Sequence, residues 1–210
     1  MKVEAMMNRK VVTVSEKATI EEGKQQMKQH RIRHLPVVDD DLKLIGIVSD
    51  RDLIEWKNTG NESDPASALI ESVMTRNVIT AHPREFIEEL LSIFYDERIG
   101  CIPVVEDQHV VGIITERDML YTLIQLTGAH QPSSQIEVSV DNIAGKLAEV
   151  TAVIKKHHVN ITSVLVYPGE IELTKVLVLR VQTMNPKVII ESLRAEGYNV
   201  LWPAVPGERL

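Results

Sequence analysis

The first 125 residues carry an order of apolar and polar positions that occurs twice. Each copy begins with a short β-branched segment, which predicts a strand, and continues with a segment that has the apolar period of a helix. Two continuous apolar runs then predict buried strands, and a last helix is predicted to begin at Ser49 or at Thr115. Each copy therefore reads β-α-β-β-α. The strands are predicted at 11–13, 36–38 and 44–48 in the first copy and at 78–80, 103–105 and 110–114 in the second.

The helix of the second copy has the clearer apolar face. Phe86, Ile87, Leu90, Leu91 and Phe94 follow the i, i+3, i+4, i+7 spacing of an amphipathic helix. We therefore predict that these five side chains face the core.

The two copies also have similar residues at equivalent positions. A shift of 67 positions places Met7 over Met74, and "GIVSDRDLI" at 46–54 returns as "GIITERDML" at 112–120. One copy is too small to bury both faces of its sheet, so the two are predicted to pack together.

These motifs resemble a known family. "IRHLPVVD" with "GIVSDRD", and "IGCIPVVE" with "GIITERD", resemble the CBS domain, which occurs in tandem pairs called Bateman modules. The resemblance implies an α/β fold with repeats at 1–62 and 63–125.

The repeated Ser/Thr-x-x-Asp element has two interpretations. Ser49 with Asp52, and Thr115 with Asp118, can cap their helices. Alternatively, the two carboxylates accept the hydroxyls of a ribose while the hydroxyls and free amides of the helix start face phosphate. CBS pairs use these positions in the second way, so the resemblance implies an adenine nucleotide as regulatory ligand and no other cofactor.

The two repeats differ just before their Pro-Val-Val segments. Arg33 and His34 stand before Pro36, whereas Gly100 and Cys101 stand before Pro103. Only the first repeat can supply cations from these positions; the other interpretation is a solvated Arg33 and a small buried Cys101. The resemblance implies these nucleotide-binding residues: Thr13, Arg33, His34, Pro36, Ser49, Asp52, Thr80, Cys101, Pro103, Thr115 and Asp118.

The last third of the chain has a different pattern. Gly, Pro and polar residues predict a linker at 126–135, and beyond it the order β-α-β-β-α-β predicts a ferredoxin-like domain. "VSVDNIAGKLAEVTAVIKKHHVNITSV" resembles the ACT domain, which places that domain at 136–205. The resemblance implies an amino acid effector at Asp141, Gly145 and Asn160; in the local interpretation Asp141 caps a helix, Gly145 allows close packing and Asn160 starts a strand.

Composition and motif spacing remove several classes of function. The net charge of −7 argues against a nucleic-acid-binding protein. A single cysteine permits no internal disulfide, and the seven histidines have no metal-ligand spacing, so we expect no metal site. No apolar run is long enough to span a membrane and no secretory signal begins the chain, so we expect a cytoplasmic protein.

No catalytic constellation is present, so we expect a non-catalytic metabolite sensor that acts on an unknown protein target. The combination of domains resembles the acetoin-utilisation B family of Gram-positive bacteria, which implies regulation of acetoin or butanediol breakdown. Both domain types also imply a homodimer. Two alternatives remain: an enzyme of unrecognised type that uses His34 and Cys101 in the cleft, and a transcriptional co-regulator.

Overall fold

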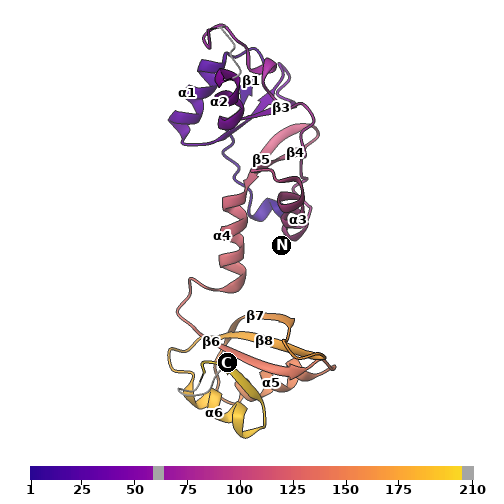
Figure 1. Cartoon of the computed structure of the whole chain (residues 1–210), viewed down its shortest axis with the longest axis vertical. Helices are drawn as coiled ribbons and strands as arrows, with labels where there is room; N and C mark the ends of the chain where they lie inside the picture. The colour runs from indigo at the N-terminus through magenta and orange to yellow at the C-terminus, as the bar shows by residue number, and fades with distance from the viewer. Residues whose placement is uncertain (59–63, 205–210) are drawn as a thin grey trace. The chain divides into compact units, whose positions relative to one another are not determined.

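The helices and the paired central strands follow one another in the predicted order (Figure 1), but among the described residues the second copy has no strand at 78–80. A short 3-10 turn precedes each repeat. This computed structural model describes residues 1–58 and 64–204 and divides into two compact units, Met1–Leu120 and Tyr121–Leu210. The elements of the first unit are η1 (Val3–Ala5), β1 (Val14–Ser15), α1 (Ile20–His30), β2 (His34–Val38), β3 (Leu44–Ser49), α2 (Asp50–Asn58), η2 (Ile70–Ser72), α3 (Ile87–Glu97), β4 (Cys101–Glu106), β5 (His109–Thr115) and the start of α4 (Glu116–Thr127).

The predicted central strands are confirmed, and the predicted first strands are corrected. The β2–β3 and β4–β5 pairs are antiparallel. The first strand is β1, which pairs in parallel with β2 two to three residues later than predicted, and in the second copy an isolated bridge joins Ala81 to Val104. A β-branched segment becomes a strand only where a neighbouring strand lies beside it, and here that begins at Val14.

The apolar face predicted for α3 is confirmed in part. Ile87, Leu90 and Phe94 are buried, but Phe86 is 54% exposed and Leu91 43% exposed. Phe86 precedes the helix in an extended conformation, and Leu91 lies outside the buried face that Ile87, Leu90 and Phe94 form.

The two cores of the first unit exchange segments. The core of the first repeat includes Ile70 and Met74, which come after it in the chain, whereas the core of the second repeat includes Val3 and Met7 from the N-terminus. Backbone bonds accompany the exchange, because Asn8 bridges to Ile113 and Thr75 to Ile47. A division at residue 62 therefore separates each core from a segment that completes it.

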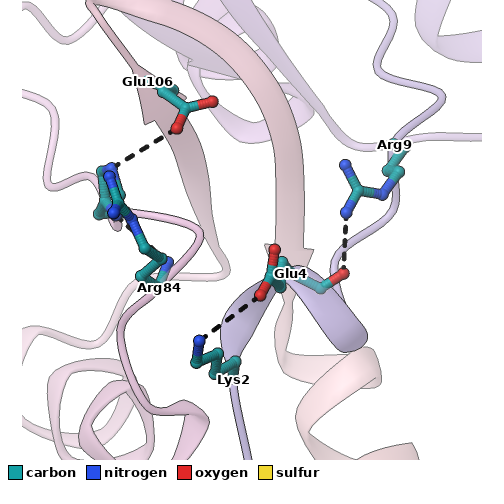
Figure 2. A network of polar contacts seen from close by, with 6 residues as sticks. Lys2, Glu4, Arg9, Arg84 and Glu106 are labelled. Atoms are coloured by element: carbon teal, nitrogen blue, oxygen red, sulfur yellow. Dashed lines mark hydrogen bonds and ion pairs between the residues drawn. The ribbon is translucent and has the colours of Figure 1, made fainter.

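Polar contacts on the surface join residues of the N-terminal segment to one another (Figure 2). Lys2 pairs with Glu4 at 3.9 Å, and the guanidinium of Arg9 donates to the carbonyl oxygen of Glu4 at 3.2 Å. Nearby, His82 and Glu106 approach to 4.0 Å. These exposed contacts contribute little stability, so the buried Val3 and Met7 hold the segment in place.

The second unit has the predicted β-α-β-β-α-β order. The strands form one sheet in the order β7-β8-β6-β9, the ferredoxin-like arrangement, with a core of side chains from the sheet, α5 and α6. The helix after β6 begins at Lys146, so Asp141 ends β6 and is not the helix cap that the sequence suggested. Its elements are β6 (Ser134–Asp141), α5 (Lys146–Lys155), β7 (Ile161–Pro168), β8 (Thr174–Val181), α6 (Lys187–Ala195) and β9 (Asn199–Trp202).

The segment between the two patterns is partly helical. α4 continues to Thr127, so the first residues of the predicted linker at 126–135 belong to that helix. Among the residues that the structure describes, no helix has the length and apolar character needed to cross a membrane.

Candidate functional site

Both Ser/Thr-x-x-Asp elements form capping boxes. The backbone N–H and the hydroxyl of Ser49 both donate to Oδ2 of Asp52 at 2.7 Å, and the backbone N–H of Asp52 donates to Oγ of Ser49 at 3.2 Å. Thr115 and Asp118 repeat this geometry, with distances of 2.8, 2.6 and 3.3 Å. The capping interpretation therefore applies to both copies, and it fixes the orientation of each carboxylate.

One of the two boxes lies on a pocket within the first unit. The pocket has a volume of about 470 Å³ and brings together Thr115, Asp118, Arg33 and His34, four residues that the sequence predicted for one site. The full lining is Asn8, Lys10, Val11, Val12, Arg31, Ile32, Arg33, His34, Gly100, Ile113, Thr115, Glu116, Arg117 and Asp118.

The other predicted residues do not line this pocket. Pro36 and Pro103 are buried in β2 and β4. Thr13 is exposed just before β1, and Thr80 is exposed just before the isolated bridge of Ala81. Ser49 and Asp52 belong to the capping box of the first repeat, on β3 and α2.

Cys101 is buried beneath the surface of the second repeat. It is 6% exposed and pairs across β4 and β5 with Thr115. Burial raises the pKa of its thiol to about 12, so the thiol stays protonated and is a weak nucleophile. The enzymatic alternative therefore loses the cysteine on which it relied.

Several lining residues were not found by sequence reasoning. Lys10, Val11 and Val12 lie just before β1, and Arg31 lies at the end of α1 in a left-handed conformation. Neither segment has a regular period that marks a site. Arg117 does have a signal, because it lies inside the repeated Ser/Thr-Asp/Glu-Arg-Asp stretch.

His34 is held close to neutral by its surroundings. Burial lowers the pKa of its ring from the usual 6.5; Asp50, Asp52 and Glu116 oppose this, and Arg33 adds to it. Of the two cations predicted from the first repeat, His34 is therefore mainly uncharged near pH 7.

Gly100 gives the ring of His34 its space. A Cβ atom on Gly100 would lie 2.9 Å from both Cε1 and Nε2 of His34. Any side chain at position 100 must displace the ring, so the difference between the repeats at this position is also a packing requirement.

The pocket lies between two copies of one motif, and the comparison with known families identifies that motif. The CBS domain matches residues 3–58 and 70–125, which together are more than half of the chain. The chain belongs to the CBS domain family. The predicted tandem CBS pair is thereby confirmed.

Solved structures and relatives resemble the CBS pair. A putative acetoin utilization protein from Vibrio cholerae is 34% identical with a TM-score of 0.56, and the match covers 64% of this chain and 98% of that one. The CBS domain pair of protein MJ0100, in complex with 5′-methylthioadenosine and S-adenosyl-L-methionine, is 31% identical with a TM-score of 0.54 over 62% and 98% of the two chains. Homoserine O-acetyltransferase of Methanohalobium evestigatum is 34% identical over 56% of this chain, which spans only 23% of that enzyme.

The second unit has a polar pocket of its own, of about 440 Å³. Asp141 lines it together with Lys146, Glu149 and Tyr198. Lys146 and Tyr198 donate to Glu149 at 2.8 and 3.1 Å, and the first of these bonds lowers the pKa of Glu149 more than the second.

The structure separates the three predicted effector residues. Of the three, only Asp141 lines this pocket. Gly145 precedes α5 with a φ of 95°, and Asn160 donates to Gln182 at 3.4 Å. Within the described ranges, no group of three or more His, Cys, Asp or Glu side chains is arranged to hold a metal ion.

Proposed function

We propose that this chain is a non-catalytic sensor whose CBS pair binds an adenine nucleotide of the AMP, ADP or ATP class. The observation that carries the proposal is the pocket where Thr115 and Asp118 of one repeat meet Arg33 and His34 of the other. The adenosine ligands of the MJ0100 CBS pair support the adenosine part of this assignment.

The residues have complementary roles in this proposal. Asp118 accepts hydroxyl groups of the ribose, because a carboxylate can accept several hydrogen bonds and its capping box fixes its orientation. Arg33 and the free amides at the start of α4 face the phosphates.

The response passes from the ligand to another protein. A nucleotide shifts the packing of the two repeats only as far as its affinities for the two arrangements differ. The similarity to the Vibrio cholerae acetoin utilization protein supports acetoin or butanediol breakdown as the regulated process. A homodimer with an unidentified protein target completes this proposal.

A second proposed ligand concerns the ferredoxin-like unit. Its strand order supports an ACT domain at 136–205, and the pocket at Asp141 offers both a carboxylate and the ammonium group of Lys146 to an amino acid. Asp141 contributes to this proposal from the pocket lining, whereas Gly145 and Asn160 would act from outside it.

Calorimetric titration of the full-length protein with adenosine, AMP and ATP tests the main proposal. We expect saturable binding of at least one of them. Mass spectrometry of small molecules that copurify with the native protein provides an independent test. An absence of binding to all three, together with an unrelated copurified ligand, would reject the nucleotide assignment.

A further inference from the structure

The pocket of the CBS pair collects more positive charge than a single phosphate requires. Lys10, Arg31, Arg33 and Arg117 line it, against only two carboxylates, Glu116 and Asp118. Within residues 1–58 and 64–204, none of the four cationic side chains forms an ion pair or a side-chain hydrogen bond with a carboxylate. Four cations without anionic partners around one cavity favour a ligand that brings several negative charges.

The duplicated sequence supplies an internal reference for this charge. Each pocket residue has an equivalent residue in the other repeat, and these equivalents form a second set. Asn77 and Gly100 are the equivalents of Lys10 and Arg33, so the second set has two cations fewer. The remaining equivalents keep their charges: Arg98 for Arg31, Arg51 for Arg117, Asp50 for Glu116 and Asp52 for Asp118. The two carboxylates are matched between the sets, and the excess of positive charge belongs to one set only.

We infer that this pocket selects nucleotides with two or more phosphates and discriminates against AMP, adenosine and S-adenosyl-L-methionine. The inference rests on the proposed function and adds the charge class of the ligand. S-adenosyl-L-methionine carries a sulfonium and an ammonium group against one carboxylate, so its net positive charge is repelled by the pocket. Each added phosphate instead gains from the cations that the first phosphate leaves without a partner.

The part of the pocket proposed to hold adenosine does not distinguish these ligands by their charge. Thr115 and Asp118 hold each other in the capping box, and the half-buried apolar side chains of Val11, Val12 and Ile113 line the cavity. Adenosine is therefore expected to bind weakly to these residues, and the phosphates provide the additional affinity.

A titration series on the full-length protein tests the inference without any mutation. The probes are adenosine, AMP, ADP, ATP and S-adenosyl-L-methionine, at low and at high salt. We expect affinity to rise from adenosine to AMP and by about tenfold or more from AMP to ADP or ATP. The gain should shrink at high salt, because exposed charges are screened over about 8–10 Å near physiological ionic strength.

Two matched variants locate the effect. Arg117→Ala removes a pocket cation, and Arg51→Ala removes the equivalent residue of the first repeat, which does not line the pocket. Both residues are exposed in the first turn of a helix, so both variants should fold, and melting curves check this. We expect Arg117→Ala to weaken ATP by about tenfold with adenosine unchanged, and Arg51→Ala to leave both unchanged.

The possible failures are distinguishable. Equal affinities for adenosine, AMP and ATP would overturn the inference and leave the proposed function intact. Tighter binding of S-adenosyl-L-methionine than of ATP would also overturn the inference while supporting an adenosine site. If none of the five probes binds, the proposed function is wrong and the inference falls with it.

Discussion

At the scale of single residues, the two capping boxes make the same local structure and differ in what lies beside them. The hydroxyl and the carboxylate satisfy free amides of a first helical turn in both copies. Only Asp118 also faces the pocket that contains Arg33. One residue type at one motif position therefore caps a helix in both repeats and lines the pocket in only one of them.

This difference leads to a paired prediction for Asp52→Ala and Asp118→Ala. Each variant loses a capping box, so each should lose about 0.5–2 kcal/mol of unfolding free energy. Only Asp118→Ala should also lose about tenfold in nucleotide affinity, because it alone lines the pocket. Urea unfolding and calorimetry measure the two effects. Equal affinity losses in both variants would contradict this assignment.

A second prediction concerns His34 and pH. Burial lowers its pKa in the folded protein below the unfolded value near 6.5, so the unfolded chain binds more protons between the two values. Stability from this residue is therefore present above pH 6.5 and lost as the pH falls through that window. A His34→Gln variant should lose less stability than the parent between about pH 7 and pH 5. Proton NMR should show the ring of His34 titrating below 6.5, and a value above 6.5 would refute the prediction.

At the scale of the elements, the apolar pattern of the sequence predicted the strands that form contacts with their neighbours in the chain. The strands β2, β3, β4 and β5 were predicted from continuous apolar runs, and each is half of a local hairpin with a short turn. Contacts between distant segments left no such pattern. Lys10 and Arg31 line the pocket from irregular segments, and the exchange of Val3 and Ile70 between the cores depends on the folded arrangement.

The exchanged segments should contribute strongly to stability. Ile70 is fully buried in the core of the first repeat, although it lies in the stretch predicted for the second. Ile70→Ala should cost about 2–5 kcal/mol, the usual range for an aliphatic side chain removed from a core. Glu71→Ala, on the same turn but exposed, is the control and should cost less than about 0.5 kcal/mol. Urea unfolding measures both, and equal costs would mean that η2 is not part of that core.

At the scale of the whole molecule, the two units have separate cores. Among the described residues, the buried core of the second unit runs from Ile136 to Val200, whereas the cores of the first unit end at Met119. Each unit can therefore bury its own apolar side chains.

Deletion of residues 136–210 tests this separation. We expect the remaining chain to stay folded, with the circular dichroism and cooperative melting of a CBS pair, and to bind the same nucleotide as the full-length protein. The melting curve and a titration with ATP measure the two outcomes. Aggregation of the fragment, or a folded fragment without nucleotide binding, would count against independent units.

The exchange of segments between the two CBS repeats has a consequence for how this pair can be divided. A single repeat cut at residue 62 would keep Val14, Ile20 and Leu35 but lose the Ile70 and Met74 that cover them. Its N-terminal Val3 and Met7 would at the same time have no core to enter. Neither of the two resulting fragments would therefore keep a complete core. The smallest part of this chain that can complete both cores is therefore the whole pair, with the N-terminal segment and η2 included.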